Sequence, residues 1–149
     1  IALYGTACDW LVAGEGVPPG VLWFVLASAA NGAVIEFGRK IRAPADEEPG
    51  VETYSALWGR GRALALWWGA LLLGAIAALA AAAPRQAFGL VALVAGCGVA
   101  LAGWGAWRGW RYPQKVAATV ETLSAVWTLA IYLSLGLLPM LGPAWERLG

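Results

Sequence analysis

Four long stretches without a charged residue most constrain what this chain can fold into. The stretches are Gly16–Ile35, Ala63–Pro84, Gln86–Trp107 and Thr122–Trp145, with 20, 22, 22 and 24 residues. A helix of about 20 apolar residues crosses the ~30 Å hydrocarbon core of a bilayer. Only 13% of the residues are charged, against about 25% in a soluble domain. The pattern predicts an all-α, multi-pass transmembrane helix bundle. It excludes a soluble domain, a secreted disulfide scaffold, a disordered chain and a nucleic-acid binder.

Prolines and glycines divide this single domain of residues 1–149 into about four full spans and the end of a fifth. Residues 1–13 are interpreted as the end of a helix, and the full spans are expected at residues 19–42, 53–83, 86–108 and 116–138. Proline disfavours helix at the residue before it, which sets several of these ends. The chain begins with Ile1, and no basic segment precedes its first apolar residues, unlike a signal peptide. We therefore interpret it as the C-terminal part of a longer protein.

Lysine and arginine are concentrated in alternate connections between the expected spans. Residues 39–62 and 108–117 together hold eight of the ten basic residues. Short loops rich in these residues stay in the cytoplasm, so both loops are expected there. Five tryptophans near the span ends are expected at the membrane interface: Trp67, Trp68, Trp104, Trp107 and Trp110.

Small and sulfur-containing residues of the spans have structural interpretations. Gly105 and Gly109, like Gly98 and Ala102, have the spacing of close helix packing. The two cysteines are Cys8 and Cys97, which lie in apolar stretches and lack a metal or redox spacing. We expect both thiols to be buried and inert.

The polar segment at residues 31–62 is the candidate for chemistry. Five acids and five bases lie between residues 36 and 62. Glu36, Arg39 and Lys40 are spaced to share one helix face. Carboxylates hold Mg²⁺ together with substrate phosphates, and arginine or lysine binds the remaining phosphate charge. Asn31 indicates a polar cavity that enters the bundle. The alternative is a solvated loop with local ion pairs.

This segment resembles the second Asp-rich region of the UbiA superfamily of membrane prenyltransferases. The resemblance rests on the run from Asp46 to Ala63, DEEPGVETYSALWGRGRA, which follows a helix end that carries Glu36. In that superfamily an Asp-containing loop is followed by a threonine and then by Leu-x-Gly and a basic residue. Here, Arg39, Lys40 and Arg42 stand where the family usually has a further Asp. The segment is most similar to a divergent bacterial branch of the superfamily.

The resemblance implies a roughly nine-helix bundle in a bacterial inner membrane. The family's first Asp-rich motif would then lie in a missing N-terminal half, and this chain alone would be inactive. The implied reaction is Mg²⁺-dependent transfer of an isoprenyl group from its diphosphate to a hydrophobic acceptor, aromatic or lipid. Glu36 and Asp46 would be the catalytic acids, with Glu47 as a third metal ligand. The implied substrate-binding residues are Asn31, Arg39, Lys40, Arg42, Thr53, Tyr54 and Arg60.

Other interpretations remain open at this point. A transporter or permease-like bundle could use Glu36 with two further acids, Asp9 and Glu121, along a path, since an intramembrane acid is a functional hypothesis by default. Pairing of Glu121 with Lys115 or Arg111 is the simpler interpretation of that acid. Thr53 could cap a helix instead of binding substrate. A phosphatidyl-alcohol transferase is the weakest candidate, because the sequence lacks that family's Asp-Gly to Asp pattern.

Overall fold

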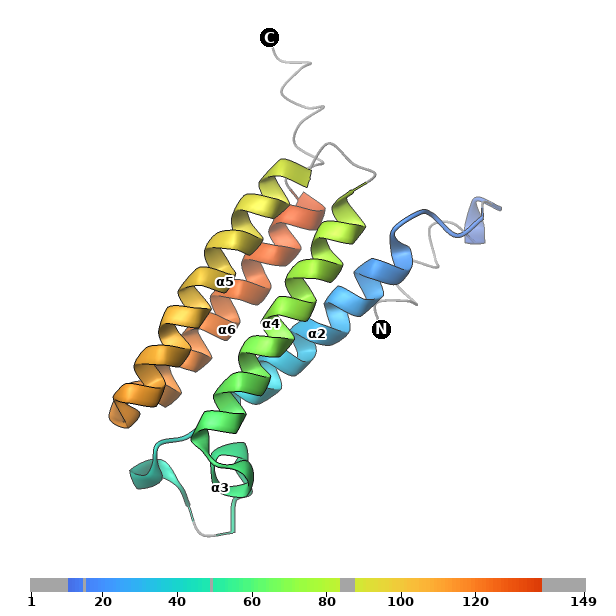
Figure 1. The fold of residues 1–149 in the computed structure, drawn as a ribbon. Coiled ribbons are helices and arrows are strands. Elements are labelled where there is room, and N and C mark those ends of the chain that lie inside the picture. Colours follow the sequence, from blue (N-terminus) through green and yellow to red (C-terminus); the bar gives the residue numbers. More distant parts are fainter. Residues whose placement is uncertain (1–10, 15, 49, 84–87, 138–149) are drawn as a thin grey trace.

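The computed structural model describes residues 11–14, 16–48, 50–83 and 88–137. These residues form helices joined by turns and contain no strand (Figure 1). The long helices are α2 (Val21–Arg39), α4 (Arg60–Ala82), α5 (Phe88–Arg111) and α6 (Val116–Tyr132). The short elements are a 3₁₀ turn at Pro44–Asp46, α3 (Tyr54–Trp58), a 3₁₀ turn at Pro113–Lys115 and a π-helical turn at Leu133–Leu137.

The expectation of an all-α bundle with four full spans is confirmed. Helices α2, α4 and α5 and the segment Pro113–Gly136 are long and apolar enough to cross a membrane. The expected helix at residues 1–13 lies largely outside the described residues, together with Cys8 and Asp9. The prolines at 84 and 139 and the last basic residue, Arg147, lie outside them as well.

The four long helices alternate in direction and close into a bundle. Helix α2 packs against α4 and α6, and α5 packs against both α4 and α6. The loop that carries α3 and the turn between α5 and α6 lie at the same end of the bundle (Figure 1). At this end the Arg60 Nη2 donates a hydrogen bond to the Trp110 carbonyl at 3.4 Å. The two basic connections therefore share one end, as the topology prediction requires; their cytoplasmic location stays a prediction.

Small residues and two tryptophans form the core. Gly105 and Gly109 lie directly against Leu123 and Val116 of the α6 helix, so the expected role of this glycine pair in helix packing is confirmed. Trp67 is fully buried, and its Nε1 donates a hydrogen bond to Ser124 Oγ at 2.8 Å. The expectation that Trp67 lies at the membrane interface is therefore wrong, because its ring is needed to fill the space between α4 and α6.

The outer face of the bundle is apolar. Large side chains such as Ile76, Leu93 and Leu129 are about 60% or more exposed. Large exposed apolar surfaces of this kind mark a contact with lipid or protein, which fits helices that cross a membrane. Cys97 also lies on the exposed surface of α5, so its expected burial is wrong. In a helix that is apolar all round, hydrophobic periodicity cannot tell the core face from the lipid face.

Several helix boundaries differ from the sequence prediction. Helix α2 ends at Arg39 and not at Arg42. The expected helix at residues 53–83 is two helices, because Gly59 adopts φ 80° and ψ 145° between α3 and α4. Glycine reaches this positive φ without steric cost. Near the other end of the chain, α6 gives way to the π-helical turn before residue 138.

Candidate functional site

The end of α2 is joined to α3 by Lys40. The Lys40 Nζ lies 2.8 Å from Glu36 Oε1 and 5.4 Å from the centre of the Tyr54 ring. The Lys40 carbonyl accepts a hydrogen bond from the Tyr54 backbone N–H at 3.0 Å. Tyr54 in turn stacks on Trp58, with ring centres 4.6 Å apart. Main-chain, ionic and ring contacts therefore hold the short helix α3 against the end of α2.

Thr53 organises the loop between these helices. Its Oγ1 accepts a hydrogen bond from the Ala56 backbone N–H at 3.2 Å, and its hydroxyl donates to Glu47 Oε1 at 3.1 Å. Ser55 Oγ accepts a hydrogen bond from the Arg42 backbone N–H at 3.0 Å. Thr53 is 3% exposed and caps the N-terminus of α3, as one of the two sequence interpretations expected.

Two adjoining concavities lie over this loop, and we call them together the loop groove. The first, about 420 Å³, is lined by Glu36, Arg39, Lys40, Arg42, Val51, Glu52 and Thr53. The second, about 460 Å³, is lined by Arg42, Asp46, Glu48, Val51 and Thr53. Arg42, Val51 and Thr53 belong to both concavities. The fold therefore gathers most of the expected site residues at one place.

Positive charge outweighs negative charge in the first concavity. Three cations and two acids line it, and one of those acids, Glu36, is already paired with Lys40. The hydrogen bond from Lys40 to the Glu36 carboxylate, with their charge attraction, raises the pKa of Lys40 above its ordinary value. Lys40 therefore stays protonated through the physiological range. A concavity with this charge suits an anion better than a cation.

Three expected substrate-binding residues lie away from the lining of the loop groove. Asn31 is 1% exposed inside the bundle, and its Oδ1 accepts a hydrogen bond from Trp127 Nε1 at 2.9 Å. The side chain of Arg60 turns to the Trp110 carbonyl of α5. Tyr54 packs behind Lys40 against Phe37. These three residues support helices and the loop in the described structure.

The sequence interpretation did not single out Glu48, Glu52 or Val51, which also line the loop groove. The available signal was their position in the acidic run just before Thr53, from Glu48 to Glu52. Glu121 is exposed and forms no ion pair with any described residue. Its expected pairing with Lys115 or Arg111 is therefore wrong.

The carboxylates of the loop do not form a complete set of protein ligands for a metal ion. Among the described residues, no three or more Asp, Glu or Cys side chains are grouped to hold a metal. However, Asp46 and Glu48 are both exposed and line the same concavity. Mg²⁺ is commonly held by one or two carboxylates together with substrate phosphates. Asp46 and Glu48 supply the number of carboxylates that such an ion uses, whereas Glu36 is engaged by Lys40.

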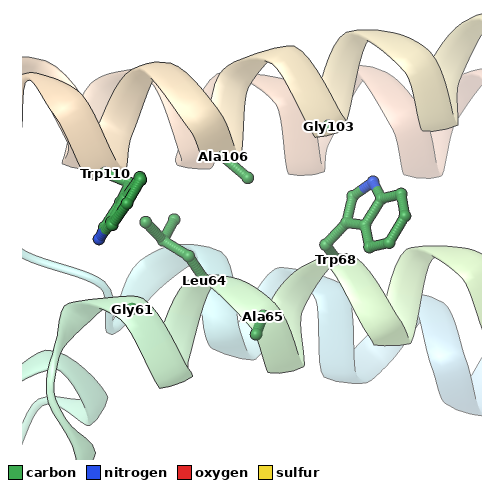
Figure 2. A pocket seen from close by; sticks show the side chains of 7 residues that line it. All are labelled: Gly61, Leu64, Ala65, Trp68, Gly103, Ala106 and Trp110. Carbon is green, nitrogen blue, oxygen red and sulfur yellow. The ribbon is translucent and has the colours of Figure 1, made fainter.

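A second groove, which we call the apolar groove, lies between α4 and α5. It encloses about 480 Å³ and is lined by Gly61, Leu64, Ala65, Trp68, Gly103, Ala106 and Trp110. Figure 2 shows that both helices contribute side chains to it and that the two indole rings lie at its two ends. At the inner end of the groove, the indole N–H of Trp68 donates a hydrogen bond to the Val99 carbonyl at 3.3 Å. The lining therefore presents hydrocarbon surface.

Comparisons with protein-family models, curated proteins and solved structures return no match. The functional argument therefore rests on the residues and their geometry.

Proposed function

We propose that this chain belongs to a membrane prenyltransferase similar to the UbiA superfamily, and that the loop groove binds the diphosphate of an isoprenyl diphosphate. The observation that carries the proposal is the convergence of Arg39, Lys40 and Arg42 on one concavity at the end of a membrane-spanning helix. A ligand bound there would place its charged head at the end of the bundle and its apolar tail toward the membrane.

The three cations suit a diphosphate in particular. Arginine and lysine form strong, charge-assisted hydrogen bonds with phosphate oxygens, and the planar guanidinium contacts two oxygens at once. Lys40 lines the concavity in an ion pair with Glu36, and the backbone N–H of Arg42 donates a hydrogen bond to Ser55. Donors that are already positioned cost little reorganisation when charge develops.

In the proposed reaction, the C–O bond of the isoprenyl diphosphate breaks and its electron pair leaves with the diphosphate. The acceptor forms the new bond to the allylic carbon and loses a proton to solvent. Arg39, Lys40 and Arg42 stabilise the negative charge that develops on the leaving group. Mg²⁺, where bound by Asp46 and Glu48 together with phosphate, would neutralise part of the same charge. The cytoplasmic side remains the proposed location of the groove.

The first experiment measures binding of farnesyl diphosphate to the chain in detergent micelles, and diphosphate release by the longer protein that the UbiA resemblance implies. Arg42→Gln removes the cation shared by both concavities. We expect it to weaken binding about tenfold or more, since hydrogen bonds to charged groups contribute about 1.5–3 kcal/mol. Asp46→Ala should reduce Mg²⁺-dependent release by about two orders of magnitude, the scale of a lost transition-state contact.

Arg62→Gln is the matched control, because Arg62 is exposed and lines neither part of the loop groove as described. Equal binding by the Arg42 and Arg62 variants would refute the site assignment. Transport of a solute into liposomes without any diphosphate release would favour the alternative of a transporter or permease-like bundle.

A further inference from the structure

The apolar groove runs along α4 and α5, and its length is comparable to the hydrocarbon thickness of one membrane leaflet. On α4 its lining runs from Gly61 to Trp68, and on α5 from Trp110 to Gly103. Seven residues of helix rise about 10 Å, whereas one leaflet contributes about 15 Å of hydrocarbon. The groove therefore begins at the loop end of the bundle and runs inward for most of one leaflet. A partner helix that spans the membrane would need a contact surface of ~30 Å, which is longer than this groove.

Positive charge is gathered at the mouth of this groove. Arg60 immediately precedes Gly61, and its Nη2 reaches the Trp110 carbonyl at 3.4 Å. The buried Nε of Arg60 has no hydrogen-bond partner among the described residues. Arg108 and Arg111 lie in the last turn of α5 at the same end, and the Arg108 guanidinium lies over the Trp104 ring, outside the groove lining, at 5.2 Å. Within the described part of the chain, the one ion pair is that between Glu36 and Lys40, so no carboxylate neutralises these three arginines.

We propose that the apolar groove binds one acyl chain of an anionic phospholipid and that the lipid phosphate contacts Arg60. The hydrocarbon lining accommodates the chain, and Arg60 at the mouth, which forms no ion pair among the described residues, attracts the headgroup. Basic pockets between transmembrane helices bind anionic headgroups in this way. Trp110, which is 62% exposed, covers the groove at the level where an indole ring favours the interface. This lipid site is separate from the loop groove and does not depend on prenyl transfer.

The test uses the full chain of 149 residues in detergent micelles, with native mass spectrometry to measure lipid binding. Phosphatidylglycerol and phosphatidylcholine with identical acyl chains are the two probes. We expect the chain to bind phosphatidylglycerol more tightly. Arg60→Gln should reduce this preference about fivefold, which corresponds to about one cation near an anionic headgroup. Arg62→Gln removes the same charge from an exposed residue outside the groove lining and should retain the wild-type preference.

A second variant tests the hydrocarbon part of the site. Ala65 is exposed and lines the groove, so Ala65→Phe fills the groove without altering the core. We expect this variant to bind both lipids more weakly while its helical circular dichroism is unchanged. Equal affinity of the wild-type chain for the two lipids would overturn the proposal. So would equal effects of the Arg60 and Arg62 variants, undiminished binding to the Ala65 variant, or a dimer that forms across this face and excludes lipid.

Discussion

Trp127 of α6 donates a hydrogen bond from its indole Nε1 to Asn31 Oδ1 of α2, at 2.9 Å and across 96 positions of sequence. Both residues are at least 96% buried. A polar group that faces hydrocarbon without a partner is costly, so this bond pairs two groups that neither lipid nor an apolar core could satisfy. The bond between Trp67 and Ser124 does the same for α4 and α6. These two hydrogen bonds specify which faces of the helices meet.

Trp127→Phe removes the donor and leaves Asn31 Oδ1 buried and unpaired. We expect the free energy of unfolding to fall by about 1 kcal/mol, the scale measured for hydrogen bonds between membrane helices. Titration with sodium dodecyl sulfate in mixed micelles, followed by circular dichroism, measures the change. Trp104→Phe is the control, since Trp104 is 52% exposed. Equal stability of the two variants would show that the hydrogen bond contributes nothing.

Gly98→Ala tests one of the close approaches between α5 and α6. A Cβ at this position would lie 2.5 Å from Trp127 Cε3, whereas one at Gly96 on the same helix would meet nothing within 4 Å. We expect Gly98→Ala to lower the free energy of unfolding by about 1–3 kcal/mol through overpacking. Gly96→Ala should leave it unchanged or raise it by about 0.5–1 kcal/mol, because alanine favours the helix. The same detergent titration compares them, and a stable Gly98→Ala variant would contradict the observed packing.

Thr53→Ala removes the cap of α3 and the hydrogen bond to Glu47. The expected loss is about 1 kcal/mol, and it is local, because α3 is a five-residue helix at the edge of the bundle. Limited proteolysis within residues 50–59 should become faster, while Thr53→Ser, which keeps the hydroxyl, should resemble the wild type. If alanine and serine variants are cut at the same rate, Thr53 does not stabilise the loop through its hydroxyl.

The pKa of Lys40 tests the ion pair at the loop groove. The paired Glu36 carboxylate raises this pKa above the ordinary value of 10.5, so the protonated form is favoured in the fold. While Glu36 stays ionised, the contribution of Lys40 protonation to stability is fully present below the unfolded-state pKa of Lys40 and is lost as pH rises through the raised value. Glu36→Gln should lower the Lys40 pKa toward 10.5.

A ¹³C NMR titration of the lysine side chains measures this shift. The chain has two lysines, so the signal of Lys115 serves as an internal reference. A Lys40 titration that is identical in the wild type and in the Glu36→Gln variant would show that the pair does not form in solution.

The expected site was partly predictable from sequence because its residues are close together in the chain. Glu36, Arg39 and Lys40 share one helix face through their spacing alone, and Thr53 carries the signal of a helix cap. The path of the loop that follows α2 was not predictable from residue spacing. Lys40 leaves the helix and Gly50 within the loop adopts a positive φ, and these two local changes let the loop fold back. They bring Glu52 and Thr53 against the end of α2.

The environment of Asn31, in contrast, was not predictable from the sequence. Its place in an apolar span indicated a polar cavity, but the span alone does not reveal that an indole 96 residues away pairs with its amide. Trp67 and Cys97 show the same limit of sequence prediction. Trp67 is fully buried and Cys97 is exposed. Both lie on helices whose faces are almost equally apolar, so the sequence does not indicate which face is buried.

The sequence by itself determined that four apolar helices long enough for a membrane connect through two basic loops at one end. That outcome follows from the length of the uncharged stretches and from the hydrocarbon thickness that they match. Only the tertiary structure decided which faces meet, where Asn31 and Arg60 point, and that an apolar groove with a basic mouth opens between α4 and α5. The reason is physical: when nearly every side chain is apolar, hydrophobicity no longer distinguishes inside from outside. Close packing against glycine and a few buried hydrogen bonds then select the arrangement.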